Sequence, residues 1–86
     1  MFEWDDDNVG HIAEHGVTPE EAEAAMLDRH KVPAQSYSTT SERRWAIVGS
    51  TDGRRLLFVV FTRRGRLVRV LSARDASASE RRRYRR

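Results

Sequence analysis

Hydrophobic positions are spaced as in helices over the first third of the chain and form strand-like runs over most of the remainder. Val9, Ile12 and Ala13 follow the i, i+3, i+4 spacing of one helix face. The acidic residues Asp5–Asp7 just before them supply an N-cap and a favourable charge for a helix start. The pattern therefore predicts a helix from this acidic run to about His15.

A second helix start follows almost at once. Thr18 is a preferred N-cap residue, Pro19 suits the first helical position, and Glu21 stands where the glutamate of a capping box is found. The helix is predicted to run from Pro19 to about Leu27, and its apolar stripe consists of small residues and one methionine. Such a stripe indicates close packing against a sheet.

The rest of the chain is dominated by β-type patterns. The predicted strands are Phe2–Trp4, His30–Pro33, Arg43–Val48, Leu56–Thr62 and Leu67–Ala73, with a polar loop over Ala34–Ser41. Short Gly-containing turns join the last three strands, which makes them antiparallel neighbours. Because Leu56–Phe61 is apolar at every position, this strand should lie in the middle of the sheet with both faces covered.

A third capping pattern, Ser77 to Glu80, predicts a C-terminal helix from Ala78 to about Arg85. The order of elements indicates an α+β two-layer fold, with two N-terminal helices packed on one face of an antiparallel sheet and a C-terminal helix after it. No internal repeat or second hydrophobic core is visible. We expect residues 1–86 to form a single domain.

Composition narrows the class of protein. The chain has 86 residues, of which 38% are hydrophobic, so it can enclose one small core and cannot be a large multi-domain enzyme. It contains no cysteine, which excludes a disulfide scaffold and thiolate metal sites. The longest apolar run is Leu56–Phe61, far short of the roughly 20 residues that span a bilayer. We expect a soluble, cytoplasmic protein without membrane contact.

Charge is distributed unevenly along the chain. Residues 1–30 hold nine acidic residues against one basic residue, a net charge of −8, whereas residues 31–86 carry +11, and fifteen of the sixteen basic residues are arginine. Arginine's planar, permanently charged fork suits phosphate and stacked bases. The basic part therefore points to a polyanion such as nucleic acid. The alternative is an arginine-rich composition with ordinary solvated faces.

Two arginines of the last strand are candidates for catalysis. By alternation Arg69 shares a face with Leu67, Leu71 and Ala73, which look buried, so its charge requires an acidic partner or an anionic ligand. As a catalytic group it would hold a phosphate and stabilise the charge added in the transition state. The alternative is an ion pair with Glu42 or an N-terminal acid. Arg74 lies just beyond the strand and could join it, or could be an ordinary surface residue.

Glu42 is the only carboxylate between Asp28 and Asp52, which makes it the first candidate for a general base if the basic half cleaves RNA. The alternative is an ion pair with Arg43 or Arg69. In the strand that follows, Arg43 should share the face of Trp45, while Arg44 points to the other face. Trp45 could stack on a base, although strand tryptophans more often belong to a core.

Three polar residues of the first helix have a spacing that would allow them to bind a metal ion together. Asp7, His11 and His15 follow at i, i+4 and i+8 and would share one helix face, and His30 could complete a metal site. No known metal signature is completed, so we predict no metal. His15 remains a possible acid or base. No nucleotide-binding or serine-hydrolase motif is present, so we expect no cofactor.

Several segments, taken together in their order, resemble one protein family, the BrnT toxins. The matching segments are FEWD at 2–5, HGVTPEEA at 15–22, ERRW at 42–45, DGR at 52–54, TRRG at 62–65, RVLSAR at 69–74, and ER at 80–81 with Tyr84. The resemblance covers nearly the whole chain. It implies a RelE-like ribonuclease toxin of a bacterial type II toxin–antitoxin system, which cleaves RNA without a metal and inhibits translation and growth.

The resemblance also implies partners and site residues. The partner would be a BrnA-like ribbon-helix-helix antitoxin, with the toxin paired as a homodimer inside a heterotetramer. The residues carried over as catalytic are Glu42, Arg43, Arg69 and Arg74. The residues expected to contact RNA are Arg44, Arg54, Arg63, Arg64, Arg81 and Tyr84. The mechanism expected is attack of the RNA 2′-OH on the adjacent phosphate. The competing hypothesis is a non-catalytic basic module that binds nucleic acid or an acidic protein.

Overall fold

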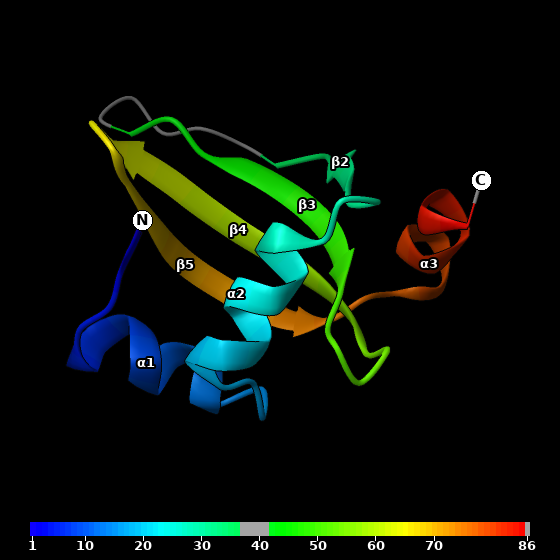
Figure 1. Ribbon diagram of the computed structural model, residues 1–86, viewed down its shortest axis with the longest axis horizontal. Coiled ribbons are helices and arrows are strands. Elements are labelled where there is room, and N and C mark those ends of the chain that lie inside the picture. The colour runs from blue at the N-terminus through cyan, green and yellow to red at the C-terminus, as the bar shows by residue number, and fades with distance from the viewer. Residues whose placement is uncertain (37–41, 86) are drawn as a thin grey trace.

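The chain folds as three helices and a five-stranded sheet in a computed structural model that describes residues 1–36 and 42–85 (Figure 1). In chain order the elements are β1 (Phe2–Glu3), α1 (Asp6–Ala13), α2 (Pro19–Leu27), β2 (Val32–Ala34), β3 (Trp45–Ser50), β4 (Leu56–Arg64), β5 (Leu67–Asp75) and α3 (Ala78–Tyr84). The predicted α+β class and the order of the elements are confirmed. The relation to the RelE fold stays a prediction, and residues 37–41 of the predicted polar loop lie outside the described residues.

The sheet has the order β1-β5-β4-β3-β2, so β4 is its central strand, as its continuous apolar run predicted. All neighbours are antiparallel except β1, which pairs parallel to β5. The prediction of an antiparallel sheet was therefore wrong at this edge, and the sheet is mixed. Two residues of β1 carry too little pattern to show in which direction they pair.

All three helices begin with the capping boxes that their sequences contain. The side chains of Asp5, Thr18 and Ser77 accept hydrogen bonds from backbone N–H groups of the first turns, and the residue three positions on closes each box. α1 ends at Ala13, two residues before the predicted end. β3 begins at Trp45 rather than at Arg43, so Arg43 and Arg44 precede the strand.

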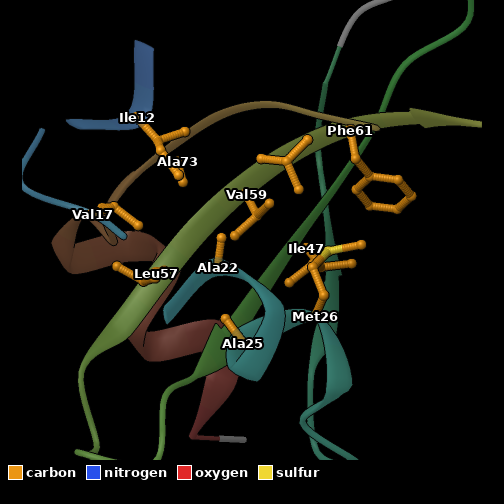
Figure 2. Packing of buried hydrophobic residues seen from close by; sticks show 11 residues of the cluster. Ile12, Val17, Ala22, Ala25, Met26, Ile47, Leu57, Val59, Phe61 and Ala73 are labelled. Carbon is orange, nitrogen blue, oxygen red and sulfur yellow. The ribbon is translucent and has the colours of Figure 1, made fainter. Parts of the chain in front are cut away.

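α1 and α2 cover one face of the sheet, which we call the α1–α2 face. Figure 2 shows the core there, in which Ile12 and Ala22 from the helices pack with Leu57, Val59 and other side chains of the strands. The backbones approach very closely at Gly49, where a Cβ atom would lie 2.1 Å from the carbonyl oxygen of Ala25. The small residues of α2 therefore permit the close packing that the sequence indicated.

α3 packs on the opposite face, which we call the α3 face. Val48 and Phe58, which alternate with α1–α2 face residues along β3 and β4, join Tyr84 of α3 in a second apolar cluster. None of the residues of α3 is buried, and the helix covers only one end of this face (Figure 1). The remainder of the α3 face is bordered by arginines, among them Arg44 and Arg74.

Candidate functional site

A β-bulge in β5 determines which face each of its side chains takes. Val60 pairs with Ser72, but the next residue of β4, Phe61, pairs with Val70. Leu71 is therefore an extra residue in β5. Both Leu71 and Ser72 line a pocket on the α3 face, because a bulge re-aims the side chains next to it.

Because of the bulge, Arg69 lies on a different face of the sheet from the one that the sequence predicted. Val70 and Ala73 both belong to the core of the α1–α2 face, so Arg69 takes the other face and does not share the face of Ala73. Leu67, which was expected to be buried beside it, is 36% exposed. The arginine is thus at the border of the α3 face and not inside an apolar layer.

Arg69 is held by an N-terminal acid, the alternative that the sequence left open. Its guanidinium donates two parallel hydrogen bonds to the Asp5 carboxylate, at 2.9 and 3.1 Å. The hydrogen bond from Arg69 is the main cause that lowers the pKa of Asp5, and the same bond raises the pKa of Arg69. Because Asp5 is also the N-cap of α1, the pair fastens the start of α1 to β5.

Arg74 lies on the α3 face beside an aromatic ring. Its guanidinium carbon is 4.2 Å from the ring centroid of Phe58, and its nitrogens donate to Glu80 of α3 at 2.9 and 3.1 Å. Burial raises the pKa of Glu80, but the hydrogen bonds from Arg74 and from the backbone of Ser77 outweigh it and leave this pKa lowered. The Arg74 side chain remains 40% exposed, so its charge is accessible to an anion.

Arg44 lies at the other side of the same face and is ion-paired with Glu42. Nε of Arg44 is 3.2 Å from Oε1 of Glu42, so the ion pair of Glu42 is with Arg44 and not with Arg43 or Arg69. Arg44 borders a pocket of about 560 Å³, which we call the α3-face pocket. Its lining residues are His11, Gln35, Ser36, Arg44, Phe58, Val60, Leu71 and Ser72.

A second cluster of predicted site residues lies apart from this pocket. The ring of Trp45 stacks on Phe61 with 6.1 Å between centroids, and it packs against the core of the α1–α2 face. The guanidinium carbons of Arg43 and Arg63 lie 5.4 and 5.2 Å from the Trp45 ring. A hollow of about 260 Å³ is lined by these three residues together with Glu42, Thr62 and Arg64. The predicted site residues are therefore divided between two groups, which are linked by the ion pair of Glu42 in this hollow with Arg44 in the α3-face pocket, and Arg43 does not join Arg74.

The remaining candidates occupy separate places. Arg54 is an exposed turn residue with a φ of 66°, and Arg81 is exposed on α3. The hydroxyl of Tyr84 donates to the Asp28 carboxylate at 2.5 Å and so docks α3. The His15 ring is exposed and meets the ring of His11 edge-on at 6.3 Å. The roles of these residues in RNA binding or proton transfer stay predictions.

Asp28, like Tyr84, connects distant elements. Its carboxylate also accepts hydrogen bonds from the backbone N–H groups of Ser50 and His30, at 2.8 and 2.9 Å. Burial raises the pKa of Asp28, but these hydrogen bonds and the one from Tyr84 outweigh it and leave the pKa lowered. One carboxylate thereby joins the end of α2 to β3 and α3.

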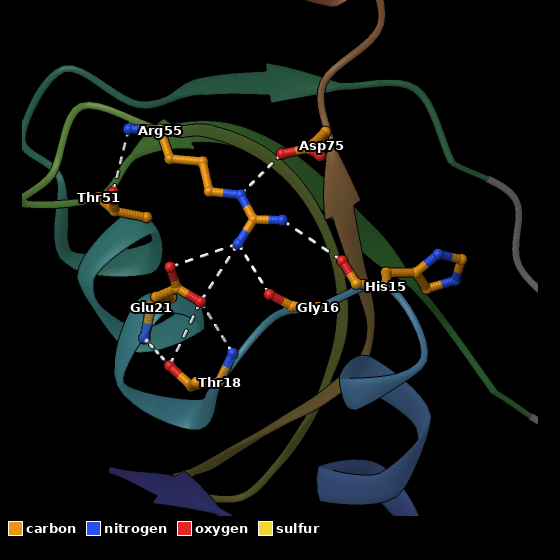
Figure 3. Close-up of polar contacts among 7 residues, drawn as sticks. All are labelled: His15, Gly16, Thr18, Glu21, Thr51, Arg55 and Asp75. Atoms are coloured by element: carbon orange, nitrogen blue, oxygen red, sulfur yellow. Dashed lines mark hydrogen bonds and ion pairs between the residues drawn. The ribbon is translucent and has the colours of Figure 1, made fainter.

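Arg55 is the most connected arginine that sequence reasoning missed, and Figure 3 shows its contacts. Its Nε donates to Asp75 at 2.7 Å, and its terminal nitrogens donate to the carbonyl oxygens of Gly16 and His15 and to the carboxylate of Glu21. These partners come from the α1–α2 junction, from α2 and from the end of β5. In the sequence, the only indication of this role is that Arg55 lies between a turn and an apolar strand.

Neither a metal cluster nor a membrane-spanning helix is found in the part of the chain that the structure describes. Within residues 1–36 and 42–85, no three or more histidine and carboxylate side chains are arranged to hold a metal ion. Asp7, His11 and His15 therefore do not form the metal site that their spacing allowed. In the same ranges no helix combines the length and the apolar character needed to cross a bilayer.

Comparison with known proteins gives one family. Residues 4–80 match a family model described as the ribonuclease toxin, BrnT, of type II toxin–antitoxin systems. No curated protein matches the chain. Because the family match covers most of the 86 residues, including α1, α2 and the four longer strands, the protein belongs to the BrnT family of type II ribonuclease toxins.

Proposed function

We propose that the protein is an endoribonuclease that cleaves RNA on its α3 face by attack of the RNA 2′-OH, without a metal ion, and so inhibits translation and growth in the cytoplasm. The observation that carries this proposal is the placement of Arg44 and Arg74 around the α3-face pocket in a member of a ribonuclease family. Phosphate contacts position RNA, and arginine forks are well suited to them.

The proposed reaction uses the substrate's own nucleophile. The 2′-oxygen forms a bond to the adjacent phosphorus, the bond from phosphorus to the 5′-oxygen breaks, and the products carry a 2′,3′-cyclic phosphate and a 5′-hydroxyl. The phosphorane gains negative charge on its way, which nearby guanidinium groups stabilise. We assign this stabilising role to Arg74, whose side chain is partly exposed beside the pocket.

Two proton transfers complete the reaction. Glu42 is the proposed base that accepts the proton of the 2′-OH, since it lines the hollow beside Arg43 and is ion-paired with Arg44 at the rim of the α3-face pocket. The leaving 5′-oxygen requires a proton in return. His11 lines the pocket, whereas His15 does not, so His11 replaces His15 as our candidate for this acid.

Arg69 takes a different role in this proposal. Its guanidinium is paired with Asp5 as that of Arg74 is with Glu80, but the Arg69 side chain is only 13% exposed, against 40% for Arg74, so it is less accessible to a phosphate. We therefore infer that Arg69 positions α1 and its His11 relative to β5. Arg43, Arg54, Arg63, Arg64, Arg81 and Tyr84 stay candidates for contacts with RNA outside the reacting phosphate.

The test is cleavage of a labelled single-stranded RNA in excess EDTA, with the ends of the products identified. We expect cyclic phosphate ends and unchanged activity with the chelator, and Arg74→Gln should lower the rate about 100-fold. Arg82→Gln removes one positive charge from an exposed position of α3 and serves as the matched control. Activity that disappears with EDTA would refute the metal-free mechanism.

A third variant separates charge stabilisation from docking of α3. Glu80→Gln breaks the ion pair of Arg74 but keeps the guanidinium. If Arg74 stabilises the phosphorane, Glu80→Gln retains most of the activity, whereas equal losses in both variants would mean that Arg74 only docks the helix. Tight RNA binding without any turnover by the wild type would favour the competing function, a non-catalytic basic module.

A toxin of a type II system works together with a protein antitoxin, and we propose a BrnA-like ribbon-helix-helix protein as this partner. In the proposed complex two toxin chains pair as a homodimer within a heterotetramer. Co-expression with the product of a neighbouring reading frame should suppress growth arrest, and light scattering should give the mass of two toxins and two antitoxins. A complex of another mass would refute this arrangement, and growth arrest that persists would refute the choice of partner.

A further inference from the structure

The α3-face pocket combines an apolar floor with a polar rim. Phe58 and Val60 of β4 and Leu71 of β5 supply the floor, and none of the three is fully buried. Ser72, Arg44 and His11 stand around them with groups that donate or accept hydrogen bonds. At about 560 Å³, the pocket falls within the range of about 300–1,000 Å³ that is usual for small-ligand sites.

From this arrangement we propose that the α3-face pocket binds one unstacked base of single-stranded RNA and so gives the toxin a base preference next to the cleaved bond. This inference rests on the proposed function, because it takes RNA as the ligand. A base offers two flat apolar surfaces and a polar edge, which match the floor and the rim respectively. Proteins that recognise RNA sequence commonly splay out single-stranded bases in this way.

Charge beside the pocket favours a nucleotide over an uncharged ligand. The Arg74 guanidinium lies 4.2 Å from the centroid of the Phe58 ring, so a cation sits next to the pocket floor. Arg44 brings a second cation to the rim. A base in the pocket would thus have an arginine near to receive the phosphate attached to its sugar.

The bulge of β5 is what makes room for the base. Leu71 and Ser72 both reach this face because Leu71 is the extra residue opposite Val60. Without the bulge, one of the two would point into the core of the α1–α2 face. The bulge thereby contributes to base recognition as well as to the shape of the sheet.

The test uses four short 2′-O-methyl RNA homopolymers, of A, C, G and U, which lack the 2′-OH nucleophile. Their binding is followed by fluorescence anisotropy. We expect the wild type to prefer one base, and Ser72→Trp, which fills the pocket, to remove the preference and to weaken the best oligomer about tenfold. Leu71→Ala should weaken it several-fold, whereas Leu67→Ala, in the same strand but outside the pocket, should bind as the wild type does.

A second measurement does not depend on any variant. In the wild-type protein, methyl resonances of Leu71 and Val60 should shift when the preferred oligomer is added, and those of Leu67 should not. Equal binding of all four oligomers, or shifts confined to residues outside the pocket, would overturn the inference. Base-selective binding in a protein that never cleaves RNA would support the pocket and refute the proposed ribonuclease mechanism. Cleavage with the same pattern in wild type and Ser72→Trp would refute the pocket alone.

Discussion

Replacing Arg55 by alanine should destabilise the protein by about 2 kcal/mol, although the residue is polar and not fully buried. Two of its hydrogen bonds go to the carbonyl oxygens of Gly16 and His15, and bonds of this kind contribute about 0.5–1.5 kcal/mol each. The ion pairs with Glu21 and Asp75 add less, because the Asp75 side chain is 61% exposed and exposed pairs give at most about 1 kcal/mol.

This loss is measurable as a shift of the thermal midpoint. For a domain of this size, 1 kcal/mol corresponds to about 4–8 °C, so Arg55→Ala should melt roughly 10 °C or more below the wild type in a circular dichroism scan. The adjacent Arg54→Ala is the matched control, because it removes the same charge from an exposed turn position. If both variants melt within about 3 °C of each other, Arg55 does not tie the α1–α2 junction to the sheet, and the reasoning is refuted.

Four further predictions concern stability. Gly49→Ala should cost about 1–3 kcal/mol or more in urea unfolding, since its Cβ would meet the Ala25 carbonyl. Gly10→Ala in α1, with no atom within 4 Å, should instead gain about 0.5–1 kcal/mol, and a loss there would contradict the open surroundings. Tyr84→Phe removes the hydrogen bond to Asp28 and should speed trypsin cleavage within α3; an unchanged rate would show that α3 is held by other contacts. Stability should be flat from pH 7 to pH 5 and fall as the pH drops through about 4. The sign follows because five carboxyl groups have pKa values lowered by folding, so the unfolded chain takes up protons first. They are Asp5, Glu21, Asp28, Asp75 and Glu80. Titration followed by calorimetry would refute this if stability rose on acidification.

Local patterns in the sequence were sufficient to predict most of the fold. Capping residues predicted all three helix starts, as an acidic N-cap run before α1 and as capping boxes before α2 and α3, because a cap depends only on residues close together in the sequence. The uninterrupted apolar run of β4 predicted its central position, since only a strand covered on both faces tolerates apolar residues at every position.

Long-range features were the ones that could not be predicted. The β5 bulge depends on how β5 pairs with β4, and without it strict alternation put Arg69 on the face of Ala73. The partners of Arg55 are 20 to 40 residues away along the chain. The family resemblance selected its neighbour Arg54, which is an exposed turn residue. The candidate site could not be predicted for the same reason. Strand alternation could assign Arg43 and Arg44 to opposite faces but could not place either residue beside a pocket.

The ion pairs in the structure explain part of the uneven distribution of charge along the sequence. Acids of the N-terminal third hold Arg69 and Arg55, so part of the basic excess fastens α1 and α2 to the sheet instead of facing a ligand. Arg74 differs, since its partner Glu80 comes from α3, the helix on the candidate RNA face. A carboxylate and a phosphate compete for the same arginine fork, because both accept its two parallel hydrogen bonds. RNA that took both parallel hydrogen bonds of Arg74 would displace Glu80, which would couple occupation of the proposed site to the docking of α3. The coupling is reciprocal, so a partner that holds α3 against the sheet would weaken RNA binding without touching the pocket itself.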